Sequence, residues 1–342
     1  MKLDAALPPV SLEDVPAIAE AAEALGFDAL WTSETQHDPF LPIALAAEHT
    51  SRLELGTGIA VSFARSPTTI AYTAWDLAAQ SGGRFILGLG TQVKAHVERR
   101  FGMAWPDSVT GKLREQIQVI RALWNTWQTG APLNFRGEQY KITLMSPFFN
   151  PGPLPSSTVG RGAEGEGIPI YIAGVNTRLA TLAGELCDGF LVHPFHTPKY
   201  LAGILLPAIE DGARKAGRAR SNVVISATVF AAATDEDRAY CRRQIAFYAS
   251  TPSYRPVMAL HGWTETAERL SSLASRGKWD EMPALIGDEM LATFAVLADE
   301  NGLAAAIRKR YDGLADRATL YLPLVPGERD GFWKRLVEAF QK

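Results

Sequence analysis

The chain has 342 residues, of which 47% are hydrophobic, and its 34 Lys and Arg against 37 Asp and Glu give a formal net charge of −3. At about 150 residues per domain, this length fits two domains or one large one with a sizeable core. A nucleic-acid surface and a polybasic membrane patch are both disfavoured, because each requires clustered positive charge and the chain has no long basic block.

Export and membrane insertion are also disfavoured. No apolar run approaches the length of about 18 residues that a bilayer span needs. The first 14 residues contain prolines and acids and lack an apolar signal-peptide region, so we expect a cytoplasmic protein. The two cysteines, Cys187 and Cys241, lie far apart in the sequence and have no metal-ligand spacing, so we expect buried thiols without a disulfide or zinc site.

Short apolar or β-branched runs alternate with longer stretches of helical periodicity along the whole chain. The strands expected from these runs are Leu3–Leu7, Ala29–Thr32, Leu53–Ala60, Phe85–Leu89, Ile168–Ala173, Gly189–Val192, Val223–Ala232 and Thr319–Leu322. The first intervening helix is predicted to begin near Ser11 or Asp14 and to end at Gly26, a residue type that tolerates a left-handed cap. A later helix has one apolar face from Leu113 to Trp127.

Strands that alternate with crossover helices indicate a parallel sheet, and eight such pairs favour a closed TIM (β/α)8 barrel. The alternative is an open, doubly wound α/β sheet. Its dinucleotide fingerprint should follow the first strand, but the glycine pair Gly88 and Gly90 follows the fourth run and lacks the third glycine. We therefore expect residues 1–342 to form a single barrel domain.

Two insertions interrupt the alternation. Residues 134–140 are predicted to form a hairpin, and the following segment, about 141–167, becomes rich in Gly and Pro from 150 onward. That segment is either a lid over the mouth of the barrel or a disordered surface loop. The second insertion, about 250–289, contains Tyr, His, Trp and Met residues and is predicted to be helical and packed.

Function in such a barrel lies at the carboxyl ends of the strands. The loop after the second strand has the densest group of titratable side chains, with Glu34, His37 and Asp38, and a His beside carboxylates is suited to proton transfer at neutral pH. The structural alternative is that Asp38 caps the next helix and His37 is an ordinary loop residue.

Small residues mark three further strand ends. Gly56 and Gly58 lie within the third strand, where missing side chains would let a flat ring approach the backbone. The segments 88–92 and 172–177 both lead toward a helix N-terminus, which favours a phosphate-bearing ligand, although glycines there also serve turn geometry alone. His193 follows the sixth strand and is either a substrate contact or a structural histidine.

Several other chemistries are disfavoured by what the sequence lacks. Strands four to seven carry no Lys for Schiff-base chemistry, and no HExxH, GxSxG or P-loop motif occurs. Acidic residues at the strand ends are too few and scattered for a metal site, so we expect none. A basic run at Lys94, His96, Arg99 and Arg100 is either a solvated helix face or a contact for a polyanionic ligand tail.

The sequence resembles the bacterial luciferase-like superfamily, and most closely its coenzyme F420-dependent oxidoreductases. The resemblance rests on GFDALWTSE, LELGTGIAV, RSP, SGGRFILGLGTQ, FRGEQY, IPIYIAG and CDGF, which occur in the family order across nearly the whole chain. It implies a TIM barrel with a flavin-like ring at the mouth. It also implies a non-prolyl cis peptide in strand three, which matches Gly58–Ile59 here.

The resemblance assigns positions to the cofactor. Gly58 and Ile59 match the support behind the ring, and the positions matching those that hold the ribityl and phosphate groups are Thr91, Gln92, Gly174, Val175 and Asn176. The chain departs from the sugar-phosphate dehydrogenase branch, because Thr35 follows Glu34 where that branch has a His and Val93 stands where it has an acid. Glu34 and His37 are the candidates that remain for proton transfer.

Three functions follow as hypotheses. The first is hydride transfer between coenzyme F420 and a small organic substrate, since the deazaflavin carries hydride and reacts poorly with oxygen. The second is an FMN-dependent monooxygenase on the same barrel, and the third is a flavin-binding protein without catalysis. The apolar helix faces would also allow a homodimer.

Overall fold

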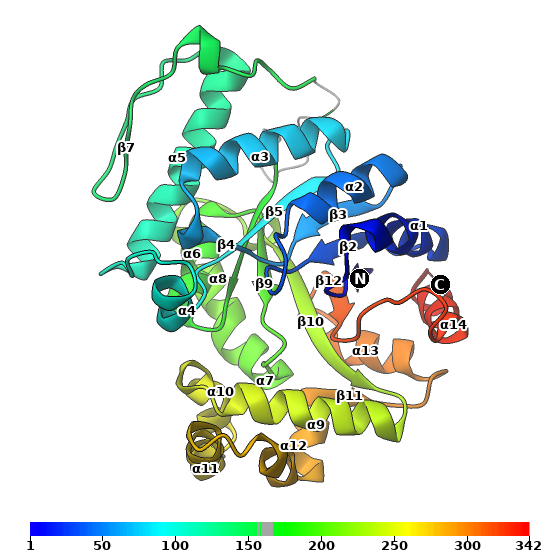
Figure 1. Ribbon diagram of the computed structural model, residues 1–342. Helices are drawn as coiled ribbons and strands as arrows, with labels where there is room; N and C mark the ends of the chain where they lie inside the picture. The colour runs from blue at the N-terminus through cyan, green and yellow to red at the C-terminus, as the bar shows by residue number, and fades with distance from the viewer. Residues whose placement is uncertain (156–157, 159–166, 342) are drawn as a thin grey trace.

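A computed structural model describes residues 1–155, 158 and 167–341, in which parallel strands form a closed barrel with helices around it (Figure 1). The eight barrel strands pair in the order β1, β2, β3, β5, β8, β9, β10, β12, and β12 pairs with β1 to complete the ring. The expected TIM barrel is therefore confirmed, and the doubly wound alternative is wrong.

The strands nearly match the runs found in the sequence. Their bounds are β1 (Lys2–Ala6), β2 (Ala29–Thr32), β3 (Glu54–Thr57), β4 (Ala60–Val61), β5 (Phe85–Gly90), β6 (Phe135–Arg136), β7 (Lys141–Ile142), β8 (Ile170–Gly174), β9 (Gly189–Val192), β10 (Val224–Ala232), β11 (Ala295–Leu297) and β12 (Arg317–Leu320). The third expected strand divides into β3 and β4, because the backbone turns at Gly58 and Ile59, and β4 pairs with β5.

Helices connect the barrel strands and surround them. Their bounds are α1 (Val15–Leu25), α2 (Leu41–His49), α3 (Pro67–Gln80), α4 (Lys94–Arg99), α5 (Val109–Thr129), α6 (Thr177–Leu186), α7 (Pro198–Tyr200), α8 (Leu206–Lys215), α9 (Asp235–Ala249), α10 (Arg255–Leu260), α11 (Thr264–Ser275), α12 (Asp288–Phe294), α13 (Leu303–Tyr311) and α14 (Asp330–Gln341). Gly26 ends α1 with a φ of 92°. The apolar face expected from Leu113 to Trp127 is buried along α5.

Aromatic and charged side chains fill the interior and the amino-terminal end of the barrel. The Trp31 and Tyr171 rings lie 5.9 Å apart inside it, where Gly56 leaves room for the indole. Arg317 Nη2 donates to Asp4 Oδ1 at 2.8 Å and its Nη1 donates to Glu54 Oε2 at 2.5 Å. These side chains join β12, β1 and β3, and they close the floor of the barrel with paired charges.

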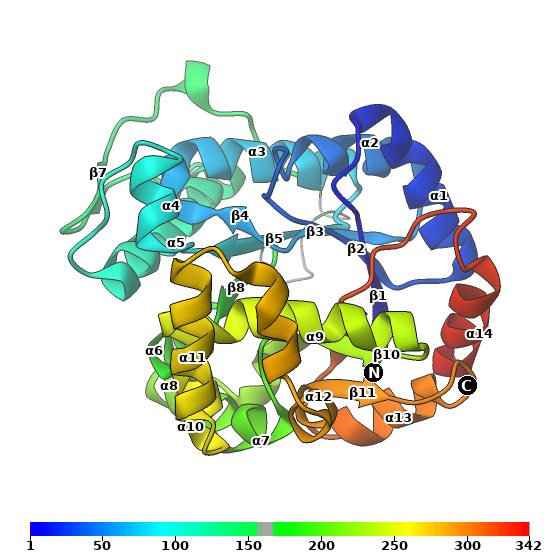
Figure 2. The ribbon, with the colours of Figure 1, turned by 60° about the horizontal axis from the view of Figure 1, so that its bottom comes forward.

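The two insertions lie on different sides of the molecule (Figure 2). The predicted hairpin is present, since β6 pairs with β7, and it projects away from the barrel. Most of the Gly- and Pro-rich stretch lies outside the described residues, so the lid hypothesis stays a prediction. Within the second segment, about 250–289, the structure forms α10 and α11, and α11 packs beside α9.

Within the described residues, no helix has both the length and the apolar character that crossing a membrane requires. Both cysteines are buried and free, as expected. Burial raises the pKa of the Cys187 thiol to about 12, so this thiol stays protonated.

Candidate active site at the mouth of the barrel

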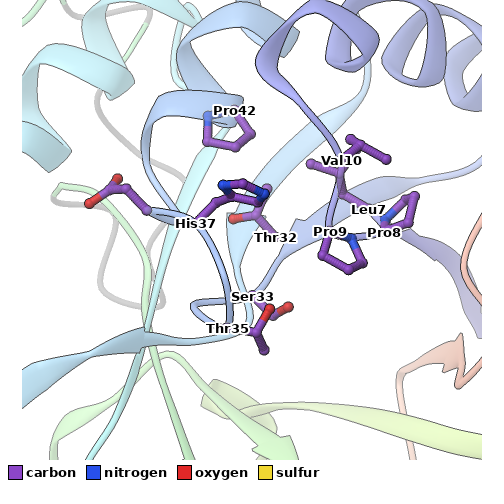
Figure 3. Close-up of a pocket in the computed structure, with 10 residues that line it drawn as sticks. Leu7, Pro8, Pro9, Val10, Thr32, Ser33, Thr35, His37 and Pro42 are labelled. Atoms are coloured by element: carbon purple, nitrogen blue, oxygen red, sulfur yellow. The ribbon is translucent and has the colours of Figure 1, made fainter. Parts of the chain in front are cut away.

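The loops after β1 and β2 border a hollow at the carboxyl ends of the strands (Figure 3). His37 is exposed and its imidazole lies beside Thr32 and Pro42 in this hollow. The residues that line the hollow are Leu7, Pro8, Pro9, Val10, Thr32, Ser33, Thr35, His37, Asp38 and Pro42. An exposed histidine therefore lies at this edge of the barrel.

Glu34 is buried and fully engaged. Its Oε2 accepts a hydrogen bond from the Val61 amide at 2.7 Å and from Arg65 Nη1 at 2.7 Å. The same guanidinium reaches Asp38 Oδ2 at 2.8 Å. Burial opposes the charge of Arg65, but hydrogen bonds to the carboxylates of Glu34 and Asp38 raise its pKa above its ordinary value.

The structure does not join the two candidates for proton transfer. Among the described residues, no hydrogen bond links Glu34 with His37. Asp38 Oδ1 accepts from the Phe40 amide at 2.8 Å and from the Leu41 amide at 3.3 Å, so it caps the start of α2 as the structural alternative expected. Arg65 is the residue that sequence reasoning missed, although the RSP motif contained it.

The backbone turns between β3 and β4 at Gly58–Ile59, and the peptide bond there is cis, as the resemblance implied. Gly58 is exposed, whereas the Ile59 side chain packs directly on Gly90, where a Cβ atom would lie 2.7 Å from Ile59 Cγ1. The Ile59 carbonyl accepts from the Glu34 amide at 3.1 Å, which ties this turn to the loop after β2. The mouth thus offers a bare stretch of backbone beside a fixed aliphatic side chain.

Thr91 and Gln92 follow β5 at the same edge. Gln92 adopts a φ of 58°, and its Oε1 accepts from the Val93 amide at 3.0 Å. The Thr91 hydroxyl donates to the Gln92 carbonyl at 3.3 Å and is partly exposed. This hydroxyl is therefore within reach of a ligand in the mouth.

Gly174, Val175 and Asn176 join β8 to α6. Asn176 Oδ1 accepts from the Leu179 amide at 3.0 Å, so its side chain caps the N-terminus of α6, where the helix dipole is positive. The Val175 carbonyl accepts from the Tyr200 hydroxyl at 2.8 Å, which fixes the loop from the outside.

His193 belongs to an aromatic cluster on the opposite part of the mouth. Its Nδ1 accepts from the Phe195 amide at 3.1 Å, its Nε2 lies 3.0 Å from the Tyr254 hydroxyl, and the Tyr254 ring stacks on it at 4.6 Å. Burial, with a smaller contribution from His196, lowers the pKa of His193 to about 3. The imidazole is therefore neutral at pH 7.

Two more tyrosines complete this cluster. The Tyr248 and Tyr321 hydroxyls lie 2.7 Å apart, and the Tyr248 ring meets His193 edge-on at 4.7 Å. Burial raises the pKa of both phenols, so both remain protonated at neutral pH. Sequence reasoning found His193 and missed the tyrosines around it. Tyr248 lies in α9, Tyr254 in the segment after α9 and Tyr321 directly after β12, so all three are far from His193 in the sequence.

A family model described as luciferase-like monooxygenase matches residues 3–317. The chain belongs to this family. An uncharacterized protein from Mycobacterium tuberculosis is 43% identical over 327 residues, which cover 93% of this chain and 92% of that protein. An F420-dependent glucose-6-phosphate dehydrogenase from Nakamurella multipartita is 29% identical over 246 residues, covering 68% and 67% of the two chains.

The fold of this luciferase-like protein is shared with solved structures. The coenzyme F420-dependent tetrahydromethanopterin reductase from Methanopyrus kandleri superposes with a TM-score of 0.80 at 21% identity, covering 99% of this chain and 97% of that one.

The luciferase-like chain presents basic side chains beside the mouth. Lys94, His96 and Arg99 on α4 are exposed, while Arg100 Nη2 donates to the Thr35 carbonyl and so holds α4 against the loop after β2. In the described ranges, no three His, Cys, Asp or Glu side chains lie close enough to hold a metal ion.

Proposed function

We propose that this protein is an oxidoreductase that binds coenzyme F420 at the mouth of the barrel and transfers hydride between it and a small organic substrate. The observation that carries this proposal is the exposed backbone at Gly58 beside Ile59, at the same edge as the N-terminus of α6. A flat ring fits against bare backbone, and a phosphate fits the positive end of a helix.

Different residues at the mouth would contact different parts of such a cofactor. Gly58 and Ile59 would support the ring, Thr91 and Gln92 would contact the ribityl chain, and the loop from Gly174 to Asn176 would hold the phosphate. When bound, the deazaflavin supplies a carbon that accepts or releases hydride. Lys94, His96 and Arg99 lie exposed nearby and would meet an anionic tail.

In this proposal, His37 is the residue that transfers a proton to the substrate. Its imidazole is exposed in the hollow after β2, so it can take a proton from solvent and pass it to a substrate. Glu34 acts through Arg65, since its carboxylate is occupied by two donors, and so positions this loop against Asp38. Thr35 and Val93 occupy the positions where sugar-phosphate dehydrogenases have a His and an acid, so we expect no turnover of glucose 6-phosphate.

An FMN-dependent monooxygenase is the second candidate, and the family description is the observation that favours it. It differs in one measurable respect, since a reduced FMN enzyme would consume oxygen during turnover. A flavin-binding protein without catalysis would bind the cofactor and turn over nothing.

The test is a fluorescence titration of the purified protein with coenzyme F420 and, separately, with FMN. We expect micromolar or tighter binding of F420 and weaker binding of FMN. Thr91→Val should weaken F420 binding about fivefold through loss of one hydrogen bond. Thr73→Val removes a hydroxyl that donates to the Thr69 carbonyl within α3, so it is the matched control and should change nothing. Preference for FMN would overturn the proposal.

A further inference from the structure

We propose that Tyr254 and the Tyr248–Tyr321 pair form a site with two outward hydrogen-bond donors that binds the oxygen of a neutral carbonyl or alcohol substrate. This inference rests on the proposed function for the identity of the hydride carrier. It adds the substrate class and names residues that hold the reacting oxygen.

The direction of the hydrogen bonds around His193 determines where the first donor is. The Phe195 amide can only donate, so Nδ1 of His193 accepts and carries no proton. The neutral ring therefore carries its proton on Nε2, which donates to the Tyr254 hydroxyl oxygen at 3.0 Å. The proton of Tyr254 is consequently not used by His193 and is free to donate to a ligand.

The second donor comes from the pair of phenols. Between the Tyr248 and Tyr321 hydroxyls only one proton can lie on the 2.7 Å line that joins them. One phenol donates and the other accepts, so the accepting phenol has its own proton left over. Both phenols are partly exposed, so this proton is available to a ligand.

The cluster lies next to the residues assigned to the cofactor. Gly174 pairs with Val192 across β8 and β9, so Val175 and His193 follow these two residues on neighbouring strand ends. Tyr321 directly follows β12 at the same edge of the barrel. An oxygen held by the phenols would thus lie in the same mouth as the ring.

The surroundings of the donors point to an uncharged substrate. The Tyr321 ring packs against Phe230 at 5.0 Å, and the Tyr254 ring against Phe195 at 5.5 Å. In the described part of the chain, no Lys or Arg side chain donates a hydrogen bond to His193 or to these three tyrosines. Aromatic walls with neutral donors suit an apolar molecule with one carbonyl or hydroxyl oxygen, whereas a phosphate or carboxylate would need a cation.

The donors assist hydride transfer without giving up their protons. When hydride reaches a carbonyl carbon, a C–H bond forms, the C=O π bond breaks and negative charge develops on the oxygen. Two neutral O–H groups stabilise that charge. Because burial raises the pKa of Tyr254 to about 12, the phenol stays a donor, and the proton that completes the alcohol comes from solvent.

The test uses 4-nitrophenol, whose ionised form presents an anionic oxygen on a neutral aromatic body. Calorimetric titration at pH 8 compares it with 4-nitroanisole, which has the same ring and no ionisable oxygen. The chain is saturated with F420 in one series and free of it in another. We expect the phenolate to bind at least about tenfold more tightly than the ether, and Tyr254→Phe to remove most of that preference.

The controls separate this inference from the proposed function. Tyr72 lies in α3, and its hydroxyl donates to the Phe149 carbonyl. Tyr72→Phe removes this hydroxyl and should leave the preference for the phenolate over the ether intact. Equal binding of the two probes, or an unchanged preference in Tyr254→Phe, would overturn the inference even if F420 binds. Failure of F420 to bind, with the preference intact, would instead count against the proposed function. Tyr321→Phe is the second variant, and if it does not fold, Tyr254→Phe alone decides.

Discussion

Arg65 connects two carboxylates of very different exposure, and this difference can be measured. The Glu34 side chain is 5% exposed, whereas that of Asp38 is 38% exposed. We expect Glu34→Gln to lower the free energy of unfolding by about 3 kcal/mol, because a mostly buried guanidinium loses the more buried of its two carboxylate partners. Asp38→Asn is the matched control and should cost less than about 1 kcal/mol. Urea denaturation of both variants checks this, and equal losses would contradict the assigned geometry.

His196 should make stability depend on pH. Its Nδ1 donates to the His193 carbonyl at 2.8 Å, and its Nε2 therefore accepts from the Tyr311 hydroxyl at 3.0 Å. Burial lowers the pKa of His196 from 6.5 to about 4, so the folded protein keeps it neutral where the unfolded chain takes up a proton. Stability is then fully present above pH 6.5 and declines as the pH falls toward 4, by about 3 kcal/mol at most.

The measurement for this prediction is thermal unfolding of the protein and of His196→Gln between pH 7 and pH 4. Glutamine keeps a polar group beside Tyr311 but cannot titrate. The variant should therefore lose less stability over this range than the parent chain. Parallel pH profiles would show that His196 is not the group responsible.

At the scale of elements, α6 and α8 pack through glycines. A Cβ atom at Gly184 would lie 2.0 Å from the Ile209 carbonyl oxygen, and one at Gly212 would lie 2.0 Å from the Thr181 carbonyl oxygen. We expect Gly184→Ala to destabilise the protein by about 2–3 kcal/mol, since the two helices must separate. Gly203→Ala has no atom within 4 Å of its new Cβ and is the control. Chemical denaturation that gives similar values for both would contradict the close crossing.

The elements that the sequence predicted well are those in which one physical signal dominates. Every barrel strand is a short apolar run followed by helical periodicity, so all eight could be found. The start of β12 was placed too late, because Arg317 is charged, and the ion pairs with Asp4 and Glu54 that allow its burial in the sheet are not visible in the sequence. The short β11 was missed, since residues 295–297 continue the apolar pattern of α12.

Local composition indicated candidate site residues only where they lie together in the sequence. Glu34 and His37 occupy one loop, and local composition identified them. The aromatic cluster combines His193 with tyrosines more than fifty positions away, such as Tyr254, whose hydroxyl lies 61 residues from it in sequence. Nothing local distinguishes these tyrosines from core residues, so only the tertiary structure brings them together.

At the scale of the whole molecule, Arg317 holds the barrel closed at its amino-terminal end. It pairs with Asp4, whose side chain is fully buried, and with Glu54. We expect Arg317→Met to cost about 3–5 kcal/mol, because Asp4 would be left without its cation. Lys2→Met is the control, since Lys2 is 48% exposed where it meets Glu54, and it should cost less than about 1 kcal/mol. Unfolding by urea, followed by circular dichroism, distinguishes the two.

The filled interior of the barrel limits how a ligand can enter and leave the site at its mouth. With Trp31 and Tyr171 inside and the paired charges of Arg317 beneath them, the described side chains fill the barrel along its axis. A molecule bound among the strand ends must arrive and depart on one side. If F420 and a substrate bind here as proposed, both enter and leave on this side, and we expect steady-state kinetics to show ordered binding, with the cofactor first on and last off.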